Sequence, residues 1–203
     1  MNFILDNTMN FILDIMGSSL IAGILFLLIL KLNLYSSNAN YYSDNELKLQ
    51  QNVKTLAEVM NYDLRKIGYK YDGTAIVTAE PTRIQFFAEM NAPGTYGHGT
   101  VDFVEYYLGD STEASATANQ RDKVLYRIVN HTDTLGGPTL GLVDFRFSYL
   151  NAQGVTTSFL DSIKYVKAEF WVEPYEHVKN YLTNQPDSSQ FTYWELTINP
   201  RNI

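Results

Sequence analysis

The sequence has 203 residues and a formal net charge of -7, and it contains no cysteine. A chain of this length accommodates one domain with a substantial core, together with an anchoring segment. The lack of cysteine excludes structural disulfides and thiolate metal sites. The acidic balance argues against nucleic acid as a partner, because phosphate binding needs a basic surface.

Residues 1–14 form a leader-like segment with an internal duplication, in which MNFILD at residues 1–6 returns at 9–14. The unit is too short and too few in number for a solenoid repeat. It fits either a recent duplication or a second start at Met9. The segment also lacks lysine and arginine, whereas a secretory signal begins with a basic region and ends at a small-residue cleavage site. Whether and where the leader is cleaved therefore stays open.

Residues 15–30 (IMGSSLIAGILFLLIL) are an uninterrupted apolar run between Asp14 and Lys31. As a helix the run extends roughly 24 Å, and continuing to Tyr35, with Lys31 reaching toward water, gives roughly 30 Å. That length crosses a bilayer, so 15–35 is predicted to be a transmembrane or filament-core helix. Small residues in the run permit close helix approach. The expected assembly surface comprises Gly17, Ser18, Ser19, Leu20, Ile21, Ala22, Gly23 and Leu25.

A polar joint is expected at residues 36–43, either as a loosened stretch of helix or as a short linker. A helix over 44–67 then opens the globular α+β domain, 44–203. Ser43 and Glu46 have capping-box spacing, and Gly68 stands where a left-handed C-cap belongs. Apolar residues recur at intervals of three and four, which predicts one buried stripe. The stripe consists of Leu49, Val53, Leu56, Val59, Met60, Leu64 and Ile67.

Beyond Gly68 the apolar period changes to two, which predicts strands. The expected strands are 74–79, 83–90, 101–108, 123–130, 140–150, 163–172 and 191–198. Turns are expected at 136–138 and 151–154, and polar loops at 91–99, 109–121 and 174–189. The spacing predicts an antiparallel sheet packed against the helix, with a core formed by Leu56, Met60, Leu64, Phe145 and Phe147.

No catalytic, cofactor-binding or metal-binding constellation is evident, and the chain is not predicted to be an enzyme. His98, His131 and His177 lie far from one another in the sequence and are interpreted as exposed loop residues. Acidic residues near 110 and 133 lack the regular alternation of oxygen ligands that a calcium loop needs. No nucleophile elbow or phosphate loop is present. Residues 130–132 match a glycosylation sequon, a match that is common by chance.

The order of an apolar helix, an amphipathic helix ending in an Arg-x-x-Gly pattern, and an antiparallel sheet resembles the type IV pilins and the type II secretion pseudopilins. The likeness is greatest to the larger minor subunits, of the prepilin W and pseudopilin J kind. The residues that carry it are LQQNVKTLAEVMNYDLRKIGY (49–69), VLYRI (124–128), VDFRFSYLNAQG (143–154), IKYVKAEFWV (163–172) and INPRNI (198–203).

The resemblance implies a structural subunit of a pilus-like filament or pseudopilus, with copies of itself or other pilin-like subunits as partners. It further implies residence in the bacterial inner membrane before assembly, and then in a cell-surface or periplasmic filament. No cofactor and no nucleic acid are expected. The alternative is a membrane-tethered extracytoplasmic binding domain that does not polymerise.

One feature departs from the family pattern. Members begin with a basic leader ending in glycine and carry a glutamate at the fifth mature position, where it is thought to pair with a neighbour's amino terminus. If Gly17 ended the leader, Ser18 would be first and Ala22 fifth, so that glutamate is missing. Asp14 and Lys31 are therefore the candidate charges that set the register between copies.

Overall fold

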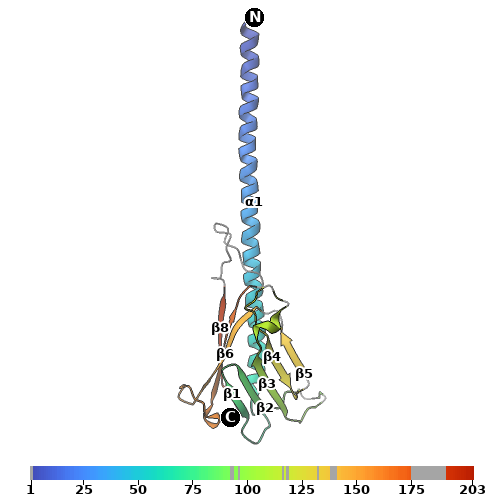
Figure 1. Cartoon of the computed structure of the whole chain (residues 1–203), viewed down its shortest axis with the longest axis vertical. Helices are drawn as coiled ribbons and strands as arrows, with labels where there is room; N and C mark the ends of the chain where they lie inside the picture. The colour runs from blue at the N-terminus through green and yellow to red at the C-terminus, as the bar shows by residue number, and fades with distance from the viewer. Residues whose placement is uncertain are drawn as a thin grey trace. The chain divides into compact units, whose positions relative to one another are not determined.

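The computed structural model describes residues 2–91, 94–95, 97–115, 117, 119–131, 133–137, 141–174 and 191–203, without the side chains of 2–10, 45 and 133–137. The chain divides into two compact units, Met1–Asn45 and Glu46–Ile203 (Figure 1). The first unit is entirely helical over its described residues, and the second combines helix with antiparallel sheet. The fold class is therefore α+β, as predicted.

Helix α1 spans Asn2–Arg65 and so contains the leader-like segment, the apolar run and the amphipathic stretch. The polar residues 36–43 are helical, which agrees with the first of the two forms expected for the joint. The capping box predicted at Ser43 and Glu46 is wrong, because a cap serves backbone N–H groups that lack a helical partner. With helix on both sides of Ser43, those groups bond to the preceding turn instead.

Helix α1 ends at Arg65, and residues 66–70 form turns. Gly68 has the predicted left-handed backbone, with φ of 77°. It has a second role as well, because a Cβ placed on Gly68 would lie 2.5 Å from the backbone oxygen of Asn202. A side chain at this position would push away the segment that follows the final strand.

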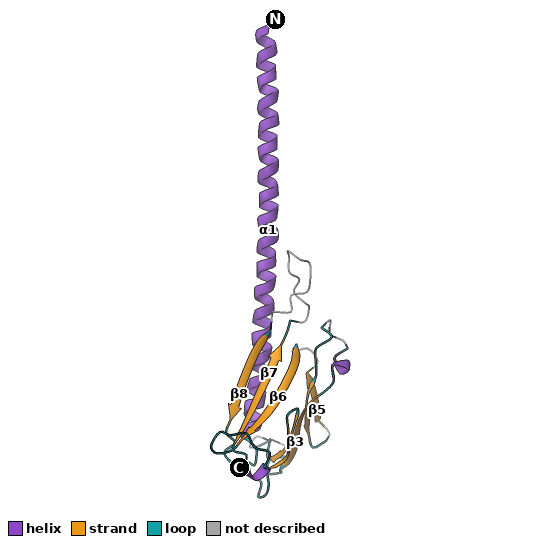
Figure 2. Ribbon diagram, turned by 60° about the vertical axis from the view of Figure 1, so that its left-hand side comes forward, coloured by secondary structure: helices purple, strands orange, loops and turns teal. Residues whose placement is uncertain are grey.

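In the described part of the chain, eight strands form two antiparallel sheets rather than the single sheet that was expected. Sheet A has the order β1-β2-β3-β4-β5, and sheet B has the order β6-β7-β8 (Figures 1 and 2). The strands of sheet A are β1 (Ile76–Glu80), β2 (Arg83–Ala88), β3 (Asp102–Leu108), β4 (Leu125–Val129) and β5 (Asp133–Gly137). The strands of sheet B are β6 (Leu142–Leu150), β7 (Tyr165–Val172) and β8 (Thr192–Ile198).

The two sheets meet where β1 turns into β2. The backbone N–H of Phe147 in β6 donates to the carbonyl of Pro81 at 2.6 Å, and the Tyr149 hydroxyl donates to the carbonyl of Glu80 at 2.9 Å. These bonds join β6 to the turn at the edge of sheet A without continuing the strand ladder. A break at this corner lets two sheets cover a wider arc of the helix than one sheet could.

All seven predicted strands are present, and no strand end differs from its predicted position by more than two residues. Strand β5 was not predicted, because Gly136 and Gly137 were interpreted as part of a turn. They instead pair with Tyr126 and Leu125 of β4. Glycine is tolerated there because β5 is the edge strand of sheet A. The turn at 151–154 is present, and most of the predicted loop 174–189 lies outside the described residues.

The core of the second unit lies between the helix and the two sheets. Leu56, Met60 and Leu64 from α1 and Phe145 and Phe147 from β6 all belong to one buried cluster. Phe145 and Phe147 meet edge to face, with ring centroids 4.6 Å apart. Val59, at one border of the predicted stripe, is exposed. The buried face is therefore centred on Met60, and the two sheets of this unit cover that face of α1.

Candidate functional site

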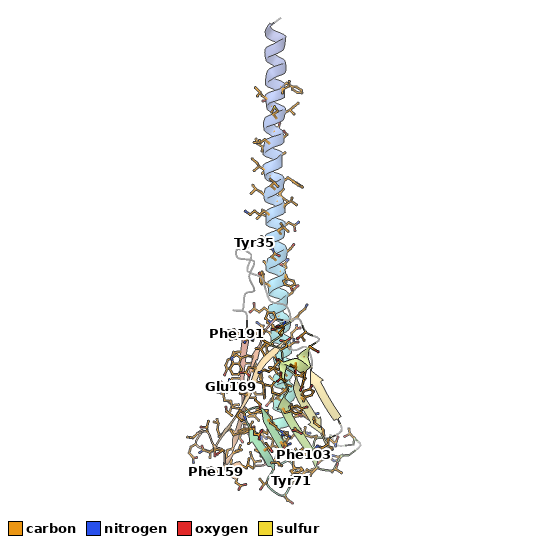
Figure 3. The ribbon with its side chains drawn as sticks, viewed as in Figure 1. Tyr35, Tyr71, Phe103, Phe159, Glu169 and Phe191 are labelled. Atoms are coloured by element: carbon orange, nitrogen blue, oxygen red, sulfur yellow. The ribbon has the colours of Figure 1, made fainter. Side chains whose placement is uncertain are left out.

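The apolar run of α1 is the most prominent candidate for a functional surface. Every described side chain from Phe11 to Tyr35 is exposed, and Leu25 leaves 54% of its surface uncovered. Figure 3 shows these side chains standing along the helix up to the labelled Tyr35. By length and composition, α1 is the helix in the described part of the chain that could cross a membrane. Apolar surface of this extent needs lipid or protein around it.

The two serines in the run are already hydrogen-bonded by the helix. The Ser18 hydroxyl donates to the carbonyl of Asp14, and the Ser19 hydroxyl donates to the carbonyl of Met16 at 3.0 Å. Their polarity is therefore satisfied without outside partners. The small size of serine would let another helix approach closely in a nonpolar environment.

The small residues do not all share one side of the helix. Ser18 and Ala22 are one turn apart, as are Ser19 and Gly23, so these four make a continuous face. Gly17 points to the opposite side at 3.6 residues per turn. Nothing lies within 4 Å of a Cβ placed on Gly17 or Gly23. Packing within the chain therefore does not require glycine at either position.

Asp14 and Lys31 cannot pair within one chain. Both belong to α1, and their separation in sequence corresponds to roughly 25 Å along the helix axis. Any pairing between these two charges has to join different copies, and the role predicted for them stays a prediction.

A buried polar cluster fastens α1 to sheet A. Asp63, only 1% exposed, accepts hydrogen bonds from the Tyr106 hydroxyl and from Nε of Arg127. A terminal nitrogen of Arg127 lies 3.3 Å from the second carboxylate oxygen. Burial, followed by the negative charge of Asp63, raises the pKa of Tyr106 well above its ordinary value. The hydroxyl therefore stays protonated and donates a hydrogen bond to Asp63. The cluster has a structural role, and we refer to Asp63, Tyr106 and Arg127 as the clasp.

A second buried carboxylate, Glu89, organises the loop after β2. Nζ of Lys70 lies 2.8 Å from one oxygen, and Nδ1 of His98 lies 2.6 Å from the other. The Gly99 backbone N–H also donates to Glu89 at 2.6 Å. The hydrogen bond from Lys70, followed by that from Gly99, lowers the pKa of Glu89 although burial opposes this. His98 is exposed and lies in a loop, as predicted, and its ring is bonded to Glu89.

The remaining candidate residues have structural partners as well. The His131 ring stacks on Phe103, with centroids 4.9 Å apart, and His177 lies outside the described residues. Asn130 of the sequon donates its amide to Asp102 at 2.7 Å, which ties that side chain into the fold. No group of three or more His, Asp or Glu side chains that could hold a metal ion occurs among the described residues.

The fold and the exposed helix together define a class: an α+β protein with an apolar helical segment that its own folded domain does not cover. No protein-family model matches the chain, and no curated protein sequence matches it. Among solved structures, it is similar to a type IV-like pilin from Thermus thermophilus, with a TM-score of 0.47 and 12% sequence identity. That similarity covers 76% of this chain and 97% of the other, and it concerns the fold alone.

Proposed function

We propose that this chain is a structural subunit of a type IV pilus-like filament or pseudopilus, assembled through its N-terminal apolar helix. The observation that carries the proposal is the exposure of every described side chain from Phe11 to Tyr35 on a helix whose later part buries one apolar face against its own sheets. The second unit has a complete core and does not need the apolar run. The run is therefore available for lipid and for other subunits.

Packing such helices side by side would remove their apolar surface from water once they leave the membrane. The continuous face of Ser18, Ser19, Ala22 and Gly23 would allow two backbones to approach closely. A head-to-tail contact between different surfaces does not close on itself, so it grows into a helical filament. Partners would be copies of this chain or other pilin-like subunits, with the bacterial inner membrane as the site before assembly.

Register between neighbouring copies would come from charges at the borders of the run. A carboxylate in nonpolar surroundings is costly unless it is paired. Asp14 directly precedes the run, and Lys31 directly follows it. We infer that the leader is retained and that Asp14 meets Lys31 or an amino terminus of a neighbouring copy.

The leading alternative is a membrane-tethered binding domain that never polymerises. It is favoured by the length of the apolar run, which is sufficient for a single span without any contact between subunits. The two functions differ in what happens to the intact chain when cells are sheared. A subunit appears in long fibres, whereas a tethered monomer remains with the membrane.

The test is electron microscopy of sheared material, with immunogold labelling of this chain. Labelled fibres support the filament, and label confined to membrane fragments supports the tethered domain. N-terminal sequencing of the same fibres tests the leader, because a start at Ser18 would remove Asp14 and end the register proposal. If the leader is present, Asp14→Asn should reduce fibre number, while Asp44→Asn, farther along α1, should not.

A further inference from the structure

A basic hollow lies where α1 ends and the segment after β8 returns to it. Its volume is about 440 Å³, within the range of small-molecule sites. It is lined by Tyr62, Arg65, Lys66, Tyr69, Asn91, His98, Arg201 and Asn202. A second hollow shares Arg65 and Arg201 with the first and continues along the end of β8. We refer to the first as the helix-end hollow.

The charge of the helix-end hollow is opposite to that of the whole chain. The chain carries a net charge of -7, yet the described residues that line the hollow include two arginines and a lysine and no aspartate or glutamate. Among the ion pairs of the described residues, none involves Arg65 or Arg201. The positive charges of Arg65 and Arg201 are therefore not compensated by an ion pair, which makes the hollow a site of positive potential in an acidic protein.

Two other side chains that line the hollow, Lys66 and His98, have partners within the fold. Nζ of Lys66 donates to the carbonyl of Met90 at 2.9 Å and lies 4.4 Å from the ring centre of Tyr62. His98 is held by Glu89, whose charge is balanced by Lys70. Arg65 and Arg201 form no ion pair among the described residues, so their guanidinium groups are available to a ligand.

The end of a helix often carries basic residues that interact favourably with its terminal carbonyls. That effect accounts for Arg65 and Lys66, which belong to the last turn and the residue after it. It does not account for Arg201, which comes from a different part of the sequence. Arg201 reaches the hollow because Gly68 lets the backbone of Asn202 approach, and the Asn202 amide donates to the carbonyl of Ile67 at 3.5 Å.

The neutral lining residues indicate which ligand groups the hollow would hold beside an anion bound by the two arginines. The Asn91 amide nitrogen donates to the carboxylate of Asp102 and to the carbonyl of Gly97, and the Asn202 amide nitrogen donates to the carbonyl of Ile67. Their amide oxygens are therefore left as acceptors, and the hydroxyls of Tyr62 and Tyr69 add groups that both donate and accept. A volume of about 440 Å³ is also far larger than one inorganic anion requires.

We propose that the helix-end hollow binds a saccharide carrying a carboxylate or phosphate group. Arg65 and Arg201 receive the anion, because the planar guanidinium forms paired hydrogen bonds with both groups. The asparagines and tyrosines hold the sugar hydroxyls. This binding site does not depend on whether the chain forms filaments, because every lining residue belongs to the second unit.

The test is isothermal titration of the full chain, in a nonionic detergent, with galacturonic acid, glucuronic acid, N-acetylneuraminic acid and glucose 6-phosphate. Galactose and glucose serve as neutral counterparts, and acetate and phosphate as anions without hydroxyl-rich rings. We expect at least one acidic saccharide to bind roughly tenfold more tightly than its neutral counterpart. The double variant R65A/R201A should lose that preference. The double variant R65K/R201K should retain part of it, because lysine keeps the positive charge but lacks the paired, planar donors of the guanidinium.

Arg146→Ala is the matched control, since Arg146 is an exposed arginine on β6, and its binding should equal that of the unmodified chain. Equal affinity for acidic and neutral sugars, no binding by any saccharide, or unchanged binding by R65A/R201A would each overturn the proposal. Binding of acetate or phosphate as tight as that of the saccharides would overturn sugar recognition. Stronger binding of a poly-glutamate peptide would identify the hollow as a contact for an acidic protein surface instead.

Discussion

Leu25 and Leu64 occupy the same helix and have opposite environments. Leu25 is 54% exposed, whereas Leu64 is completely buried between the helix and the sheets. Around Leu25 apolar residues follow one another on all sides, and around Leu64 they recur only at intervals of three and four. A helix that is apolar all round has to be covered by something other than one folded domain, whereas a single stripe is satisfied by one packed face.

The comparison separates two roles for the same kind of side chain. Leucines of the stripe stabilise the fold of the chain, and leucines of the run determine what the chain associates with. Mutations in the two parts should therefore have different readouts, with association lost in one and stability lost in the other. Four experiments test this separation.

The largest effect is expected from a charge in the apolar run. Ile21→Arg or Leu25→Arg should abolish assembly and reduce membrane insertion, because arginine near the middle of a span costs ~2.5–3.5 kcal/mol. Membrane fractionation and microscopy of sheared fibres measure the two outcomes. Leu47→Arg is the matched control, since Leu47 is an exposed leucine of α1 in the second unit, and it should leave insertion unchanged. Normal fibres from Ile21→Arg would contradict the role of the run.

The next effect concerns the clasp between α1 and sheet A. Asp63→Ala should lower the free energy of unfolding by ~3–5 kcal/mol, because it leaves the partly buried Arg127 without its counter-charge. Asp144→Ala removes a partly exposed carboxylate that pairs with Lys123 and Arg146, and should cost less than ~1 kcal/mol. Denaturant unfolding of the full chain in detergent measures both. Equal losses would mean that Asp63 contributes only as a surface charge does.

A somewhat smaller effect is expected in the stripe. Leu56→Ala and Leu64→Ala should each cost ~2–5 kcal/mol, because both side chains lie in the core cluster. Leu47→Ala, at an exposed position, should change stability by less than ~0.5 kcal/mol. Thermal melting of the full chain compares the three. Unchanged melting of both core variants would show that the helix does not pack on the sheets.

The smallest effect depends on pH. The folded pKa of Glu89 lies below the ordinary 4.5, so ionised Glu89 stabilises the fold above that pH, and the benefit disappears as pH falls through the folded pKa. Glu89→Gln should therefore lower the melting temperature at pH 7, with a difference that shrinks below pH 4. Glu58→Gln, at an exposed helical pair, should show little difference at either pH. A constant difference at all pH values would exclude a role for the charge of Glu89.

The sequence predicted the periodic parts of this fold and missed the parts that depend on distant partners. Stripe and strand positions are visible because burial imposes a period on neighbouring residues. Strand β5 was missed because its glycines favour a turn locally, and only pairing with β4 makes them a strand. The division into two sheets depends on bonds from β6 to the turn between β1 and β2, which no local pattern encodes.

The candidate functional residues also divide into those with a local sequence signal and those that depend on distant partners. The exposed run was predicted because uninterrupted apolarity is itself a local signal. Asp63 was missed because its partner Arg127 lies 64 positions later and on a different element. The helix-end hollow was missed for a similar reason, since Arg65 and Arg201 come together only through the approach of Asn202 to Gly68. Gly68 was predicted to end the helix, but its close approach to the backbone of Asn202 was not predicted.

The bond between Asn202 and Ile67 joins positions 135 residues apart, and this separation bears on the order of folding. Sheet A pairs each strand with the next one in sequence, so each of its pairings closes a much shorter loop than the contact between Asn202 and Ile67 does. The contact between Asn202 and the residues around Gly68 closes a far longer loop. We therefore expect this contact to form late in folding. We expect an intermediate in which sheet A is protected from hydrogen exchange while the end of α1 is still open. In that intermediate Arg201 is not yet beside Arg65, so ligand binding at the helix-end hollow would report completion of the fold.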